Sequence, residues 1–252
     1  MSLARPQETA PPPLASAPPR VHYPDSDGEP RAENTGQFEW IVTLKGNLDA
    51  IVPDFVAGDL LWYPVEGDNK TRMAPDAMVA IGRPKGPRGS YRQWEEDGIA
   101  PQVVFEVWSP GNRFSDVVRK LTFYQRFGVE EFYLYDPDRR ALEGWTRRED
   151  GLHPIDGIDG WVSPRLGIRF VLGPDGLEVF RPDGSRFLTF AELEQARQTA
   201  EQTRQTAEQA RQTAEQARQT AEERAAAAEA QAAALSAELT ALKAKLGLGK
   251  AR

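Results

Sequence analysis

A seven-residue repeat occupies the C-terminal part of the chain and limits that part to one kind of structure. From Glu194 the sequence steps through EQARQTA, EQTRQTA, EQARQTA and EQARQTA, then relaxes into alanine-rich segments and a leucine-bearing end. Small or apolar residues recur at alternating spacings of four and three, which is typical of a helix with one continuous seam. Thr189 and Glu192 have the spacing of an N-terminal capping box. We therefore predict a long heptad helix or coiled coil over residues 189–247, with a flexible end at 248–252.

The side chains of this seam limit how tightly the helix can associate. Most of them are alanine, which buries little surface at about 25 cal/mol per Å². Larger side chains extend the seam near the end of the repeat, at Leu235, Leu239, Leu242 and Leu246. We expect a homo-oligomer, a dimer through this tail. A helix that stays single, or one that pairs with another coiled-coil protein, is the alternative.

The start of the chain has a different composition. Residues 1–20 are dominated by Pro, Ala and Ser and hold no apolar stretch long enough for a signal peptide or a membrane span. They are predicted to be a disordered leader. The chain has no cysteine, so a disulfide framework and cysteine-based metal or nucleophilic sites are excluded. We expect a cytoplasmic protein that does not associate with membranes.

The central body, residues 21–188, alternates between strand and helix patterns. A helix is expected near 38–51, a strand or hairpin within 55–65, and short strands at 77–82 and 102–108. An amphipathic helix capped by Ser115 and ended by Gly128 precedes a strand at 130–137. This strand, helix, strand order predicts a crossover and a sheet that is partly parallel. Small antiparallel strands separated by Pro-Asp-Gly turns are expected to close the body.

One glutamate lies inside the most apolar of these segments. Glu106 is surrounded in sequence by Val104, Phe105, Val107 and Trp108. A buried carboxylate is costly unless it is paired, protonated or bound to a metal. An exposed strand face would remove that cost, but Glu106 shares its face with Val104 and Trp108. Glu106 is therefore predicted to be buried with a partner.

Two further residues qualify as that partner. Asp76 stands at the head of another apolar strand, and strands of this kind can be neighbours in a sheet. Two converging carboxylates either share a proton or hold a hard cation such as Mg²⁺. Lys120, on the following helix, has a stem long enough to bring its ammonium group over the sheet. Asp76 as a turn residue and Lys120 as a solvated helix residue are the structural alternatives, but the three residues together favour a metal site.

The segments that hold these residues resemble a known family. "APDAMVAIG", "PQVVFEVWSPGNR" and "DVVRKLTFYQRFGVEEFYLYDPD" resemble the Uma-type restriction endonuclease family, a branch of the PD-(D/E)xK nuclease superfamily, over roughly residues 21–190. The resemblance implies an α/β restriction-endonuclease-like core, with a central mixed β-sheet flanked by helices. It assigns Asp76 to the "PD" element and Glu106 to the second acid. The superfamily pattern has lysine two residues after that acid, where this chain has Trp108, so Lys120 would supply the amine from the helix.

The activity implied by the resemblance is metal-dependent hydrolysis of DNA phosphodiester bonds by an endonuclease. Asp76 and Glu106 would hold Mg²⁺ or Mn²⁺, with help from Glu33 near the first helix. Lys120 would place a positive charge near the nucleophile or the scissile phosphate, and Arg113 would contact the DNA backbone. The net charge of −7 argues against non-specific coating of nucleic acid but allows such a local site. The alternative is a catalytically inactive relative that binds or scaffolds, with the tail mediating assembly.

Overall fold

The computed structural model describes residues 21–26, 28 and 34–245. The predicted leader, Glu33 and the predicted flexible end at 248–252 lie outside the described residues. The chain divides into two compact units, one up to Phe190 and one from Ala191 onward. The first unit contains the sheet and its covering helices, and the second contains most of the long helix α3.

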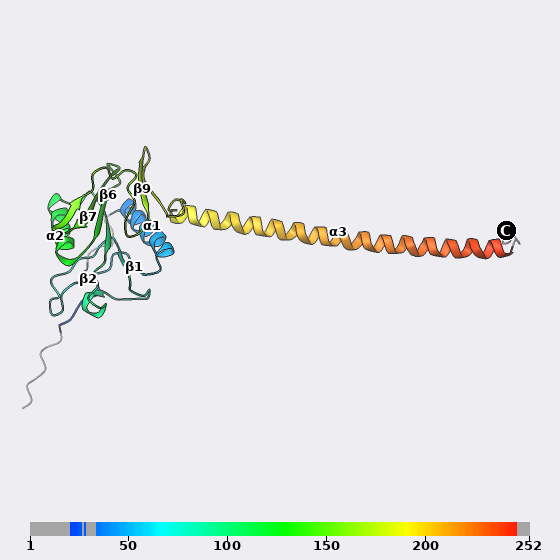
Figure 1. Ribbon diagram of the computed structural model, residues 1–252, viewed down its shortest axis with the longest axis horizontal. Helices are drawn as coiled ribbons and strands as arrows, with labels where there is room; N and C mark the ends of the chain where they lie inside the picture. The colour runs from blue at the N-terminus through cyan, green and yellow to red at the C-terminus, as the bar shows by residue number, and fades with distance from the viewer. Residues whose placement is uncertain (1–20, 27, 29–33, 246–252) are drawn as a thin grey trace, which may run out of the picture. The chain divides into compact units, whose positions relative to one another are not determined.

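A six-stranded mixed sheet forms the centre of the first unit (Figure 1). Its strands lie in the order β1 (Phe55–Ala57), β3 (Ala77–Ala80), β5 (Val103–Val107), β6 (Glu131–Asp136), β7 (Ala141–Arg148) and β8 (Gly151–Pro154). The neighbours β5 and β6 run parallel, and the other neighbouring pairs run antiparallel. The predicted crossover between 102–108 and 130–137 is therefore confirmed, since β5 and β6 are joined through a helix.

Two helices cover opposite faces of this sheet. Helix α1 (Thr35–Ile51) packs on the face that carries Phe105 and Val107. Helix α2 (Phe114–Phe127) packs on the face that carries Val104 and Phe132. Successive side chains of a strand point to opposite faces, so Glu106 points toward α2. Figure 1 shows α1 and α2 on either side of the strands.

Helix α2 begins earlier than the sequence predicts. Its N-cap is Arg113, with extended backbone angles, so the prediction of Ser115 as the cap is wrong. The carboxylate of Asp116 accepts a hydrogen bond of 2.9 Å from the Arg113 backbone N–H. An acid inside the first turn thus satisfies the cap residue, and a serine side chain is not needed. Gly128 ends the helix with φ 96°, as predicted.

The smaller strands differ in part from the prediction. Segment 55–65 forms no hairpin: β1 joins the central sheet, while β2 (Trp62–Tyr63) pairs in parallel with β4 (Tyr91–Arg92). Strand β8 was not predicted, because its GLHP sequence lacks apolar alternation and its position follows from pairing with β7. Strands β9 (Arg169–Gly173) and β10 (Gly176–Phe180) form the hairpin that the first Pro-Asp-Gly turn predicts.

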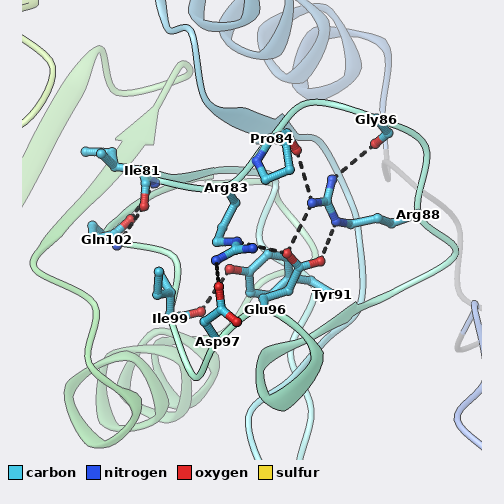
Figure 2. A network of polar contacts seen from close by, with 10 residues as sticks. All are labelled: Ile81, Arg83, Pro84, Gly86, Arg88, Tyr91, Glu96, Asp97, Ile99 and Gln102. Atoms are coloured by element: carbon cyan, nitrogen blue, oxygen red, sulfur yellow. Dashed lines mark hydrogen bonds and ion pairs between the residues drawn. The ribbon is translucent and has the colours of Figure 1, made fainter.

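Charged contacts anchor the loop between β3 and β5 (Figure 2). The short 3-10 helix η1 (Gln93–Glu95) precedes Glu96, whose buried carboxylate accepts hydrogen bonds from Arg83 at 3.2 Å and Arg88 at 2.5 Å. The Arg88 guanidinium also lies 3.9 Å from the centre of the Phe55 ring. The basic residues of this loop thus hold it against edge strand β1, which favours a structural role for them.

Helix α3 (Phe190–Lys245) is continuous, and none of its residues is buried. Each heptad of the repeat carries an Arg–Glu pair along its surface, such as Arg204 with Glu201 at 3.1 Å. The predicted fold class, an α/β core with a mixed sheet, small C-terminal strands and a long C-terminal helix, is confirmed. In the described parts of the chain, no helix combines the length and apolar character needed to span a membrane.

Candidate active site

The two acids singled out in the sequence meet at one point of the sheet. Strands β3 and β5 are antiparallel, with Ala77 opposite Phe105, so Asp76 and Glu106 occupy the next position along the ladder. The two residues are only 7% and 2% exposed. The carboxylate of Asp76 accepts a hydrogen bond of 2.7 Å from the Val107 backbone N–H. The predicted neighbourhood of the two strands and the predicted burial of Glu106 are both confirmed.

The close approach of these acids changes the charge of the pair. Burial raises the pKa of Asp76 to about 8, and the charge of Glu106 and a side-chain hydrogen bond with it act in the same direction. Lys120 and the Val107 N–H lower that pKa, but they do not outweigh burial. Without a bound cation, Asp76 is therefore mostly protonated at neutral pH. The proton on Asp76 keeps a second negative charge from forming beside Glu106.

Lys120 reaches this pair from the middle of α2. Its Nζ lies 2.5 Å from Oε2 of Glu106. Burial alone would lower the pKa of Lys120, but the charge of Glu106, and that of Asp76 once it has lost its proton at higher pH, outweigh burial, so the pKa is raised. The side chain is therefore an ammonium ion, and it is less buried than its partner. The predicted placement of an amine over the acids is what the structure shows.

A tyrosine that the sequence did not single out completes the cluster. The Tyr124 hydroxyl donates a hydrogen bond to Oε1 of Glu106. Its ring lies parallel to Trp62, with the ring centroids 6.4 Å apart, inside the apolar core on this face. Burial, together with the charge of Glu106, raises the pKa of Tyr124 well above its usual range. Both oxygens of Glu106 thus have a donor, one from Lys120 and one from Tyr124.

The spacing of Lys120 and Tyr124 was a usable signal. Residues four apart lie on the same face of a helix, so any group that Lys120 reaches is also near Tyr124. From the sequence alone, the same spacing places Tyr124 in the apolar stripe of α2, which already accounts for the residue. The ring does belong to that stripe, and only its hydroxyl takes part in the site.

Helix α1 also contacts the site, through a buried amide. The Gln37 side chain donates a hydrogen bond of 3.2 Å to the backbone carbonyl of Val107. Val107 thus holds Asp76 through its N–H and α1 through its C=O. This places the first turn of α1 beside the acid pair. Glu33, predicted as a third metal ligand, lies outside the described residues.

A small cavity adjoins Glu106 on the α2 side. It measures about 10 Å³, and its lining includes Glu106, Lys120, Asn112 and Asp116. That space suits about one water molecule or one ion. Trp108, which stands where the superfamily pattern has lysine, forms part of the wall. Arg113, the predicted DNA contact, is exposed at the start of α2 nearby.

Comparison with known proteins gives the following matches. The model of the Uma2 family, described as "Putative restriction endonuclease", matches residues 15–169. No curated protein matches the chain. Among solved structures, a crystal structure of "a putative nuclease belonging to DUF820 from Anabaena variabilis ATCC 29413" is similar, with 17% sequence identity and a TM-score of 0.39. The match covers 52% of this chain and 72% of that one.

Proposed function

Since this chain belongs to the Uma2 family, we propose that it is a metal-dependent endonuclease that hydrolyses phosphodiester bonds in DNA. The observation that carries the proposal is the convergence of Asp76, Glu106 and Lys120 from three separate elements on one buried point. An acid pair with an amine beside it suits an attack on a phosphodiester, because the acids supply hard oxygen ligands and the amine supplies a positive charge.

The donor set fits a divalent cation. Mg²⁺ takes oxygen ligands and commonly uses one or two protein carboxylates, with water and phosphate oxygens completing its shell. Within the described residues, no group of three or more His, Cys, Asp or Glu side chains could hold a metal ion. Asp76 and Glu106 would be the protein ligands, with Glu33 as a third. A Mg²⁺ or Mn²⁺ ion held there would polarise the scissile phosphate and activate the attacking water.

The residues of the chain divide the remaining work. Asp76 and Glu106 provide the negative charge that holds the cation, and Asp76 gives up its proton when it does so. The Val107 N–H and the Tyr124 hydroxyl keep the two carboxylates in position. Lys120 is the group that can turn from Glu106 toward a substrate phosphate or the attacking water. Arg113, exposed after the turn that follows β5, would contact the DNA backbone.

Plasmid cleavage tests this proposal. Supercoiled plasmid is incubated with wild type, Asp76→Asn or the control Asp175→Asn, each in Mg²⁺, in Mn²⁺ and in EDTA. Asp175 is exposed in the β9–β10 turn, so its replacement changes charge without touching the site. We expect metal-dependent nicking by wild type and the control only. Absence of cleavage by wild type, or equal cleavage by all three, would favour the alternative of an inactive binding or scaffold protein.

We also propose that α3 pairs with α3 of a second copy in parallel. In the four heptads from Glu194 to Ala221, Ala and Thr fill the two seam positions. The residue after one seam position is always Arg, as in Thr203–Arg204, and the residue before the other is always Thr, as in Thr206–Ala207. In a parallel pair each Arg lies beside a Thr of the partner helix. In an antiparallel pair Arg would face Arg, and like charges repel. Leu235, Leu239 and Leu242, each more than half exposed, add apolar surface to the seam.

A single cysteine tests the orientation, because the chain has none of its own. Ala207→Cys lies in the seam, and Gln205→Cys lies on the outer face of the same turn. We expect mild oxidation to cross-link Ala207→Cys into dimers and to leave Gln205→Cys largely uncross-linked. Sedimentation of Leu239→Glu should show a shift toward monomer. Equal cross-linking of both cysteine variants would contradict parallel pairing.

A further inference from the structure

A second, larger cavity lies beside the acid cluster. It measures about 140 Å³, and its lining includes Trp108, Phe114, Val117, Leu134, Asp136 and Glu143. Trp108, Val117 and Leu134 also line the small cavity next to Glu106, so the two cavities share a wall. The larger one lies where β5 and β6 end and α2 begins. In open α/β sheets ligands bind at the carboxyl ends of parallel strands, and β5 and β6 are a parallel pair.

The size of this cavity limits what it can hold. Pockets for drug-sized ligands measure about 300–1,000 Å³, which is too large for this site. An apolar cavity of about 150 Å³ accepts one benzene ring. The cavity therefore suits a single flat ring, and the indole of Trp108 and the ring of Phe114 offer it aromatic surfaces.

Phe114 is unusual for its exposure. Phe114 is 78% exposed. It is the first residue of α2, next to Arg113, and it lies in the chain between Glu106 and Lys120 of the acid cluster. An exposed aromatic side chain beside a site for phosphate chemistry suits stacking with a nucleobase, because every base has a flat π-face. Most of the energy of such a contact comes from the stack and does not depend on sequence.

The polar residues of the cavity add a preference. Asp136 and Glu143 contribute carboxylates, which accept hydrogen bonds from amino groups and repel carbonyl oxygens. Oδ1 of Asp136 already accepts a hydrogen bond of 2.9 Å from the Arg139 backbone N–H, and Oδ2 lies 3.7 Å from Nε of Arg139, which also lines the cavity. Glu143 is exposed at the neighbouring strand β7, opposite Leu134. Cytosine carries an amino group where thymine carries a carbonyl, so these acids favour cytosine.

We propose that this cavity binds one unpaired nucleobase next to the scissile phosphate, with the base stacked on Phe114 and its amino group facing Asp136 and Glu143. This inference rests on the proposed nuclease function and specifies its substrate: a base inside a duplex cannot enter the cavity, so the nucleic acid must be single-stranded there or have one base turned out. Two exposed arginines lie near the cavity and can attract phosphates: Arg113 is next to Phe114, and Arg139 lines the cavity with its Nε 3.7 Å from a carboxylate oxygen of Asp136.

Fluorescence anisotropy of labelled oligonucleotides tests the proposal with the full chain in EDTA, where cleavage does not interfere. The probes are short oligo(dC), oligo(dT) and a duplex of the same length. Phe114→Ala should weaken binding to both single strands by roughly tenfold, as expected for the loss of one base–aromatic stack. Phe114→Trp should preserve binding. The control Val118→Ala changes another exposed residue of α2, 46% exposed and outside the cavity, and should bind like wild type.

The base preference has its own readout. Wild type should bind oligo(dC) several-fold more tightly than oligo(dT), and Glu143→Ala should bring that ratio closer to one. The ratio is informative because removing an acid strengthens binding to any DNA, whichever base is present.

Several outcomes would overturn the proposal. The first is that Phe114→Ala and Val118→Ala bind single strands equally well. The second is that wild type binds duplex and single strands equally well. The third is that Phe114→Ala sediments differently from wild type but binds DNA unchanged. The last result would identify Phe114 as a protein contact. Loss of the nuclease assignment would appear separately, as an absence of metal-dependent plasmid cleavage with oligonucleotide binding in EDTA intact.

Discussion

Two buried glutamates lie on adjacent strands of the same sheet and have different surroundings. Glu131, on β6, is 1% exposed and accepts hydrogen bonds from the Tyr133 hydroxyl at 2.9 Å, the Arg165 backbone N–H at 2.7 Å and the Ser163 hydroxyl. Glu106, on β5, is equally buried, but its oxygens contact an ammonium group and a hydroxyl, with a second acid beside it.

The difference separates a structural carboxylate from one suited to chemistry. Neutral and backbone donors satisfy Glu131, and they tie the segment around Ser163 to the sheet. The partner of Glu106 is the ammonium group of Lys120 at the edge of a cavity, and a metal ion could take its place. Burial of a carboxylate is thus a weak sign of function, and the kind of partner it has is a stronger one.

Among substitutions that test the difference between Glu106 and Glu131, Glu106→Gln is expected to have the largest effect. The substitution keeps the shape of the side chain but removes the negative charge needed to hold a cation. We expect the initial rate of Mg²⁺-dependent plasmid nicking to fall by about 1,000-fold, or about 4 kcal/mol in barrier height. Circular dichroism checks that the variant is folded. A loss of less than about tenfold would contradict the assignment of Glu106.

The stability of the metal-free protein should depend on pH through Asp76. Its pKa is about 8 in the folded protein, against an ordinary value of 3.8 for an aspartate. Below about pH 4 Asp76 is protonated in both the folded and the unfolded protein, so its titration does not change the free energy of unfolding. Between about 4 and 8 the unfolded chain has released the proton that the folded chain keeps, so stability falls as pH rises, by at most about 1.4 kcal/mol per pH unit.

Urea denaturation in EDTA at a series of pH values measures this dependence. Asp76→Asn mimics the protonated acid and should show a shallower decline than wild type between pH 5 and 8. A wild-type stability that rises over this range, or an Asp76→Asn profile identical to it, would contradict the protonated pair.

Glu131→Gln tests the other member of the comparison. One carboxylate oxygen becomes an amide NH₂ and then faces a donor, so the free energy of unfolding should fall by about 1–3 kcal/mol. Urea denaturation measures the loss. At temperatures where the variant is folded, its nicking rate should stay within about twofold of wild type. A rate that falls as steeply as for Glu106→Gln would remove the distinction between the two glutamates.

The smallest effect is expected for Tyr124→Phe, which keeps the buried ring and removes the hydroxyl that positions Glu106. Outer groups that orient metal ligands contribute about 10–100-fold to affinity or activity, and we expect the lower end, about tenfold. The dependence of nicking rate on Mg²⁺ concentration checks this, because a positioning role should weaken metal affinity. A change in stability alone, with that dependence unaltered, would assign Tyr124 to packing.

Much of the site could be predicted from the sequence, and the missing parts share one cause. Asp76, Glu106 and Lys120 stand out because charged residues in or near apolar segments need partners. Tyr124 and Gln37 were missed because their apolar or helical contexts already explain them, and their polar contacts depend on strand β5. The sequence prediction put the N-cap of α2 at Ser115 instead of Arg113, because an acid in the first turn takes the role expected of a serine.

By itself, the sequence determined the features that depend on local periodicity: the heptad helix α3, the amphipathic helix α2 and the strand, helix, strand crossover. Side-chain spacing of this kind sets which face of an element is apolar, whatever the rest of the chain does. Only the tertiary structure decided which of the buried carboxylates has a cation and a second acid beside it. The register of β3 against β5 brings Asp76 to Glu106 across thirty residues, and that register comes from packing between distant segments.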